Sequence, residues 1–174
     1  MAKKNKYEQL YQEGRNVCGL PFPEFVQFFE GNFKKNVSVL DLGCGQGRDA
    51  LFIARMGHEV LGVDLSPTGI AQMLADARKE NLKISGVVAD IVTFEPERDF
   101  DVVVMDRVLH MFADDEERTA VLVTACVHTK PGGFILIADT PKQKSFLKAF
   151  FAGVAQDWQL FRQWKNFLIV QKNH

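Results

Sequence analysis

The sequence alternates short runs of Val, Ile and Leu with longer amphipathic stretches, and this alternation constrains the fold more than any other feature. The apolar runs that read as strands lie at residues 37–43, 58–64, 84–90, 100–106 and 134–140. Helical patterns of apolar residues separate most of them. Strands that are covered on both faces by crossover helices read as nearly continuous apolar runs. The pattern therefore predicts an α/β fold with a parallel, doubly wound sheet.

The C-terminal part of the sequence departs from this alternation. After an expected helix over residues 142–156, two strand-like runs at 158–164 and 166–172 are separated by little more than Lys165 and Asn166. So short a connection permits an antiparallel hairpin but no parallel crossover. We therefore expect a seven-stranded, mostly parallel sheet that ends in an antiparallel C-terminal hairpin, as in Rossmann-like proteins.

Length and composition indicate one globular domain, because 174 residues with 47% hydrophobic residues leave no room for a second catalytic domain. Within the domain 1–174 we expect an N-terminal arm and helix (1–36), a ligand-binding core (37–140) and a C-terminal helix and hairpin (141–174). In the arm, Tyr7, Leu10 and Tyr11 have helical spacing. A second apolar helix is expected after Pro23.

Charge and cysteine content exclude several classes of partner. Lys and Arg number 21 against 22 Asp and Glu, which gives no overall attraction to nucleic acid or to an anionic membrane. No apolar run approaches the length of a membrane span, and the three scattered cysteines suit a reducing compartment, so we expect a cytoplasmic protein. No metal-ligand spacing is present, and His58 and His128 are expected at the surface.

The stretch VLDLGCGQGRD carries the strongest functional signal. It places Gly43, Gly45 and Gly47 between the first expected strand and a helix. In an open parallel sheet, ligands bind at this edge, and glycines let the backbone approach a ligand closely. Asp64 and Asp90 end the next two strands, where a carboxylate can accept hydrogen bonds from ribose hydroxyls.

The glycine spacing separates two classes of nucleotide ligand. A dinucleotide site usually reads G-x-G-x-x-G, with the pyrophosphate at a helix N-terminus. Here Arg48 stands where the third glycine of that pattern would be. The pattern G-x-G-x-G therefore favours a nucleoside sulfonium over a nicotinamide dinucleotide.

Residues 37–70 resemble the opening of the class I S-adenosylmethionine-dependent methyltransferases. The resemblance continues through VVAD, FDVVVMDRVLHMF and KPGGFILIAD, so it covers nearly the whole chain. It is closest to the small bacterial tellurite-resistance and thiopurine methyltransferase groups. The segment at residues 11–25 resembles the lid that precedes the first strand in those groups, with Val17 and Cys18 where a tryptophan often stands.

The resemblance implies how S-adenosyl-L-methionine would be held at its methionine end. The backbone of Gly43, Cys44 and Gly45 would pass beneath the methionine part, and Asp41 would lie near its amino group. Arg15 of the arm would pair with its carboxylate, and Arg48 is a weaker candidate for the same contact.

The resemblance also implies contacts to the adenosine. Asp64 would bind the ribose hydroxyls, and Leu65 would pack on the adenine. Asp90 would accept a hydrogen bond from the exocyclic amine, with Ile91 on the other side of the ring.

Near the sulfonium, the resemblance places Asp106 and Arg107. His110 is a weak candidate for a catalytic residue, because histidine is common at this position in the family and can simply cap or pack. No catalytic residue is otherwise assigned, because a methyl transfer needs mainly alignment and exclusion of water.

The function that follows is in-line methyl transfer from S-adenosylmethionine to a small molecule. Residues Met105–Val108 do not form the NPPY-like tetrapeptide of nucleic-acid amino methyltransferases, which disfavours nucleic-acid substrates. Two alternatives stay open: a noncatalytic S-adenosylmethionine-binding module, and a nicotinamide-dependent oxidoreductase.

Overall fold

The computed structural model describes residues 2–174, with side chains from Lys6 onward. The chain divides into two compact units, of which the first ends at Ile91 and the second runs from Val92 to His174. The single domain 1–174 and its three-part division stay predictions.

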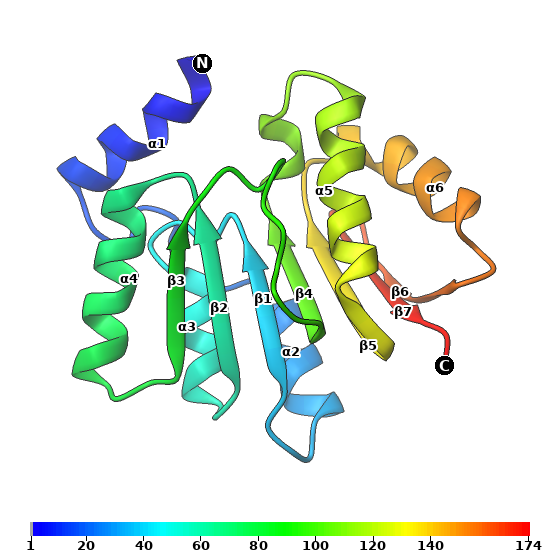
Figure 1. Cartoon of the computed structure of the whole chain (residues 1–174), viewed down its shortest axis with the longest axis horizontal. Coiled ribbons are helices and arrows are strands. Elements are labelled where there is room, and N and C mark those ends of the chain that lie inside the picture. Colours follow the sequence, from blue (N-terminus) through cyan, green and yellow to red (C-terminus); the bar gives the residue numbers. More distant parts are fainter. Residues whose placement is uncertain (1) are drawn as a thin grey trace. The chain divides into compact units, whose positions relative to one another are not determined.

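The first unit contains four helices and three strands (Figure 1). In chain order they are α1 (Ala2–Glu13), α2 (Pro23–Asn32), β1 (Ser38–Leu42), α3 (Arg48–Arg55), β2 (Glu59–Asp64), α4 (Pro67–Lys79) and β3 (Ile84–Val88). The strands pair in parallel in the order β3-β2-β1. Their carboxyl ends therefore lie at one edge, on the side where Figure 1 shows α1.

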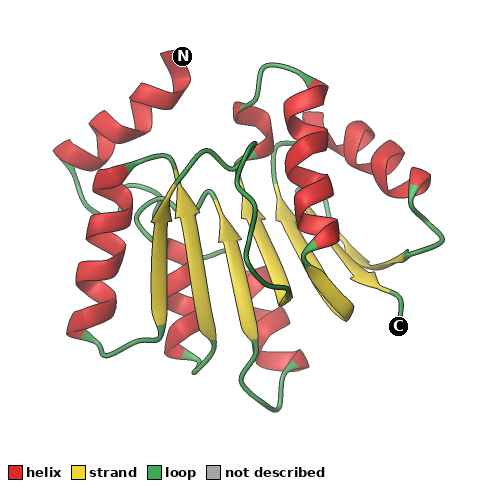
Figure 2. Cartoon of the chain, viewed as in Figure 1, coloured by secondary structure: helices red, strands yellow, loops and turns green. Residues whose placement is uncertain are grey.

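The second unit contains the four remaining strands. In chain order its elements are β4 (Phe100–Asp106), a 3₁₀ turn η1 (Leu109–Met111), α5 (Asp115–Val127), β5 (Thr129–Ala138), a second 3₁₀ turn η2 (Pro141–Gln143), α6 (Lys144–Gly153), β6 (Trp158–Gln163) and β7 (Phe167–Lys172). β4 and β5 are parallel, whereas β7 runs antiparallel to both β5 and β6. Figure 2 shows α5 in front of β4 and β5.

The predicted fold class is confirmed. The seven strands form one sheet in the order β3-β2-β1-β4-β5-β7-β6, mostly parallel with an antiparallel C-terminal hairpin. Each predicted strand is present, and helix α4 begins after Ser66, whose side chain accepts a hydrogen bond from the Gly69 N–H. That capping contact satisfies one of the free N–H groups in the first helical turn.

Several predicted boundaries are wrong. Strand β5, predicted over residues 134–140, begins at Thr129 and contains a register shift between its pairs with Phe100 and Val102. A Cβ on Gly133 would lie 2.7 Å from the Asp101 carbonyl oxygen, so the glycine lets the bulged strand keep its place beside β4. The helix expected from residue 142 begins at Lys144, because Pro141 first starts η2.

The core of each unit contains the side chains that the apolar pattern predicts. Fully buried residues include Phe28, Leu40 and Val63 in the first unit and Val103 and Ile135 in the second. Among the described residues, no helix is both long enough and apolar enough to cross a membrane.

The prediction that His58 lies at the surface is wrong. Its residue is only 4% exposed, and its ring lies 5.5 Å from the ring of Phe29 and 5.7 Å from that of Phe33. The backbone N–H of Val37 donates to its Nδ1 over 3.3 Å. Burial lowers the His58 pKa, because the charged imidazolium would lose its hydration. His58 is therefore a neutral core residue.

Candidate functional site

The glycine loop of the first unit turns sharply at the carboxyl end of β1. Gly43, Gly45 and Gly47 all have positive φ, at 82°, 53° and 81°. The N–H groups of Gly43 and Cys44 both donate to the Val63 carbonyl of β2, at 2.7 and 3.1 Å. These bonds fix the loop against the neighbouring strand, which is the rigidity a binding loop needs.

Two glycines of the loop cannot be replaced without displacing their neighbours. A Cβ on Gly47 would lie 2.3 Å from Cγ of Met73, and one on Gly45 would lie 2.4 Å from the Tyr11 hydroxyl. Both positions also have the left-handed backbone that glycine adopts at least cost. The G-x-G-x-G pattern therefore reflects close packing as well as the turn itself.

Asp64 ends β2 and contacts this loop directly. Its Oδ2 accepts the Gly45 N–H and its Oδ1 accepts the Ser66 N–H, each over 2.8 Å. Burial raises the pKa of the Asp64 carboxyl, while the Ser66 and Gly45 N–H donors act in the opposite direction. Each oxygen retains a lone pair, because a carboxylate offers about four acceptor sites. The carboxylate is thus positioned by backbone and still able to accept from a ligand.

Asp41 lies on β1, below the loop, and is 2% exposed. Its Oδ2 is buried without a hydrogen-bond partner in the described part of the chain. Burial and, secondarily, the nearby Asp49 raise the Asp41 pKa well above its usual value. A buried acceptor without a donor costs free energy, and such groups are often explained by a missing ligand or water.

Segments of the arm cover the loop. Tyr11 is 4% exposed, and its ring edge would touch a Cβ placed on Gly69 at 3.1 Å. Glu8 accepts hydrogen bonds from the hydroxyls of Ser66 and Thr68, at the start of α4. These bonds lower the Glu8 pKa. The helix α1 that leads into the predicted lid segment is therefore anchored on α4 in this structure.

The two arginines near the arm have protein partners. Arg15 forms an ion pair with Asp76 on α4. Arg48 pairs with Asp49 at 2.7 Å, and its guanidinium lies 5.3 Å from the centre of the Phe22 ring. The predicted contact of Arg15 with a cofactor carboxylate stays a prediction, and it requires Arg15 to leave Asp76.

The remaining predicted adenosine contacts lie beside the ends of β2 and β3. Leu65 is 42% exposed, whereas Ile91 is 7% exposed. The Ala89 N–H donates to the Asp64 carbonyl over 3.0 Å, which holds the segment leading to Asp90 close to the end of β2. Asp64, Leu65 and Asp90 are therefore brought to one edge, as the strand pattern predicts.

In the second unit, Asp106 and Arg107 follow one another at the end of β4. Arg107 has a φ of 55°, a left-handed conformation that costs a residue with a side chain roughly 1–3 kcal/mol. Its N–H donates to the Ala138 carbonyl over 2.7 Å, and its Nε lies 3.6 Å from Oδ1 of Asp106. Strained residues of this kind cluster at functional sites.

His110 lies in η1 and is oriented by Asp139. The Nδ1 of His110 lies 3.1 Å from Oδ1 of Asp139, and its backbone N–H donates to the other carboxylate oxygen over 3.2 Å. The Thr140 N–H adds a third contact to this carboxylate at 2.6 Å. If Nδ1 carries the proton, Nε2 is an acceptor directed away from Asp139. Sequence reasoning missed Asp139, which is 6% exposed.

A family model described as a methyltransferase domain matches residues 39–133, more than half of the chain. The chain belongs to this methyltransferase family. The predicted class I S-adenosylmethionine-dependent methyltransferase is confirmed, and S-adenosyl-L-methionine is the cofactor of that class.

The chain is similar to two curated relatives, of which the TehB protein supports the expected subgroup. The chain is 36% identical over 99 residues to the probable S-adenosyl-L-methionine-dependent methyltransferase TehB of Haemophilus influenzae, covering 57% of this chain and 34% of that protein. It is 32% identical over 137 residues to Hemagglutinin 1 of Eikenella corrodens, covering 71% of this chain and 44% of that protein. The chain thus spans less than half the length of these relatives.

A solved structure supports the fold. The N-methyltransferase NodS from Bradyrhizobium japonicum WM9, in complex with S-adenosyl-L-homocysteine, is similar with a TM-score of 0.77 at 15% identity, covering 98% of each chain. This likeness bears on the architecture alone.

The residues of the first unit fit such a cofactor. The unpartnered Oδ2 of Asp41 is an acceptor suited to an ammonium group, and Asp64 is an oriented carboxylate with free lone pairs. The Tyr11 hydroxyl lies over Gly45, so Tyr11 must yield space if the ligand passes across this loop.

Proposed function

We propose that this chain transfers the methyl group of S-adenosylmethionine to a small-molecule acceptor. The observation that carries the acceptor class is a cavity of about 510 Å³ in the second unit, on whose wall Asp139 lies. Cavities of roughly 300–1,000 Å³ are typical of sites for small molecules.

The cofactor, when bound, supplies an electrophilic methyl group on a sulfonium. The roles of Gly43, Cys44, Gly45, Asp41 and Asp64 in holding it are part of this proposal. Asp64, which Gly45 and Ser66 already orient, would accept from hydroxyl groups without rearranging.

Alignment is the main contribution expected of the protein. Orientation of two reactants can supply about 7–11 kcal/mol of a barrier, so no charged catalytic pair is required. Where the acceptor atom carries a proton, His110 is the candidate to take it at Nε2, because Asp139 stabilises the resulting imidazolium.

Two measurements test the proposal together. Titration calorimetry with S-adenosylmethionine should give saturable heat, and transfer of labelled methyl should occur to members of a panel of small thiols, phenols and amines. Methylation of RNA or protein alone would contradict the small-molecule acceptor. Binding without transfer to any class would favour the noncatalytic module instead.

A further inference from the structure

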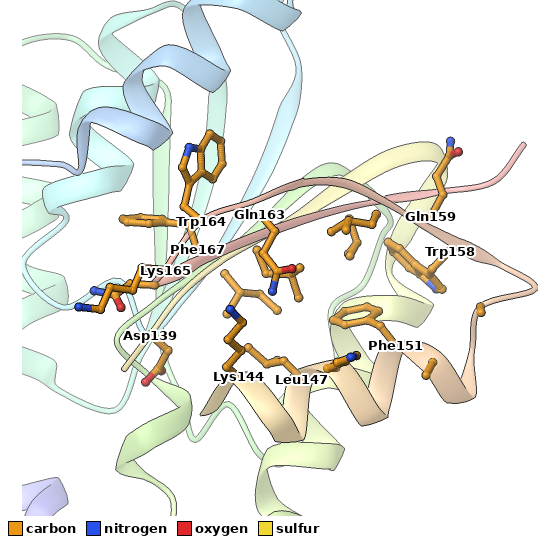
Figure 3. Close-up of a pocket in the computed structure, with 18 of the residues that line it drawn as sticks. Asp139, Lys144, Leu147, Phe151, Trp158, Gln159, Gln163, Trp164, Lys165 and Phe167 are labelled. Carbon is orange, nitrogen blue, oxygen red and sulfur yellow. The ribbon is translucent and has the colours of Figure 1, made fainter. Parts of the chain in front are cut away.

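The cavity of the second unit lies between α6 and the β6–β7 hairpin, and its walls differ in chemistry along its length (Figure 3). One end is aromatic: the ring of Phe151 on α6 lies 6.0 Å from that of Trp158 on β6. The other end contains the polar residues Asp139, Thr140 and Asn166, beside the aromatic side chains of Trp164 and Phe167 (Figure 3). A ligand that fits both ends needs an apolar body and a polar end.

Helix α6 faces this cavity with an unusual set of residues. The lining residues on the helix are Lys144, Leu147, Lys148, Phe151 and Ala152, which share one face because residues three and four apart are neighbours. Leu147 is buried, whereas Lys144 and Lys148 are exposed, so the two lysines lie at the rim of the cavity, where their ammonium groups can meet an entering ligand.

The cavity has an excess of positive charge. Lys144, Lys148 and Lys165 line it, and none of the three lies within ion-pair distance of a carboxylate in the described part of the chain. The only acidic lining residue is Asp139. Its side chain is 2% exposed and already contacts the His110 ring. The first turn of α6 contains no acidic residue either, so the positive end of its helix dipole adds to this field.

The polar end of the cavity lies beside the end of β4. Asp106 pairs in register with Ala138, the residue before Asp139, and the Asp139 N–H donates to the Asn166 carbonyl over 3.0 Å. The cavity therefore begins at the edge where the family resemblance places the sulfonium.

We infer that this cavity is the methyl-acceptor site and that it takes an organic anion with a flat, apolar body. The body packs against the wall that Phe151 and Trp158 form together, and the acidic group is bound by Lys144 and Lys148. This inference rests on the proposed function and adds the chemical class of the acceptor.

The test uses a matched pair of probes that differ only in charge. 8-Anilinonaphthalene-1-sulfonate is a flat aromatic anion, and N-phenyl-1-naphthylamine is the same skeleton without the sulfonate. Both tryptophans of the chain, Trp158 and Trp164, line the cavity, so a bound probe is detected by quenching of the protein's own fluorescence. We expect one anionic probe per chain and binding of the neutral probe at least several times weaker.

Variants that remove single lysine charges test where in the protein the anionic probe binds. Lys144→Gln and Lys148→Gln should each weaken the anionic probe about two- to fivefold, the range for single exposed ion pairs, without changing the neutral probe. Lys142→Gln is the matched control, because Lys142 lies in η2 and does not line the cavity. Ala152→Phe should weaken both probes by filling the space.

Different experimental results would contradict the proposed function and this inference. S-Adenosylmethionine should still bind, with unchanged calorimetric affinity, when the anionic probe is present. Displacement of the cofactor by the probe, equal binding of both probes, or lysine variants that behave like wild type would overturn the inference and leave the proposed function standing. Absence of cofactor binding, with the probe bound as expected, would instead contradict the proposed function.

Discussion

The backbone N–H of Gly45 donates to the carboxylate of Asp64 over 2.8 Å. This bond joins the glycine loop after β1 to the end of β2, so the two parts of the candidate cofactor site are positioned as one unit. The Asp64 carboxylate is already oriented before a ligand binds, because its second oxygen accepts a hydrogen bond from the Ser66 N–H.

Replacing Asp64 by Ala should weaken S-adenosylmethionine binding. The loss of carboxylate hydrogen bonds to the ribose corresponds to about 1–3 kcal/mol, or roughly 5- to 150-fold in the dissociation constant. Calorimetry measures this change. Glu80→Ala is the control, because Glu80 is exposed and, among the described residues, its side chain pairs with Arg55 on the surface of the first unit. An unchanged dissociation constant for Asp64→Ala would remove this residue from the site.

Asp41→Asn should raise stability and lower cofactor affinity. Burial raises the Asp41 pKa, so the folded state holds a proton that the unfolded state releases as pH rises above the ordinary Asp value. Stability attributable to Asp41 therefore falls with rising pH, and Asn removes this dependence. At pH 7 we expect a gain of about 2–4 °C in melting temperature, the shift for about 1 kcal/mol in a chain of this size.

The same Asn variant should bind S-adenosylmethionine about tenfold or more weakly, because a charge-assisted hydrogen bond is worth roughly 1.5–3 kcal/mol. A variant that is more stable and binds the cofactor as tightly as wild type would show that Asp41 does not contact the ammonium group.

His58 should make the protein less stable under mildly acidic conditions. Its folded pKa is lowered, so the unfolded chain binds more protons, and stability falls as pH decreases below about 6.5, the ordinary value for histidine. Urea unfolding at several pH values measures this slope. In His58→Asn the amide oxygen can accept from Val37 without titrating, and the slope between pH 6.5 and pH 5 should be smaller. An unaltered slope would assign the effect to other groups.

Glu8→Ala should release the arm from α4. Glu8 accepts from Ser66 and Thr68, and those bonds lower its pKa. The anchoring is therefore complete above the ordinary Glu pKa and is lost as pH falls through the lowered value. Trypsin should cleave after Arg15 several times faster in the variant, measured by mass spectrometry.

Glu13→Ala serves as the control for that experiment, since Glu13 is exposed and its side-chain bond in the described part of the chain is to Gln9 within α1. Equal cleavage rates in Glu8→Ala and wild type would mean that the arm is held by its other contacts.

The sequence predicted the first half of the site because its residues lie at strand ends. Hydrophobic runs locate the strands, and parallel strands bring their carboxyl ends to one edge, so Asp64 and Asp90 could be placed near the glycine loop without coordinates. Each strand end can be recognised from a short stretch of sequence. The parallel arrangement of the strands then places these ends close together in the fold.

The contacts that sequence reasoning missed depend on register and side-chain choice. His110 and Asp139 are 29 positions apart and meet because β4 and β5 pair with Asp106 opposite Ala138. Arg15 pairs with Asp76, which lies 61 positions away in the sequence on α4. The cavity beneath α6 depends on how far the helix stands from the hairpin, which no periodicity encodes.

The most direct test of the cofactor site is hydrogen–deuterium exchange with and without S-adenosylhomocysteine, the product form of the cofactor. We predict slower exchange in peptides that cover residues 42–48 and 63–67, where ligand contacts restrict the glycine loop and the end of β2. Binding detected by calorimetry without protection in either segment would contradict the site assigned to Gly43–Gly45 and Asp64.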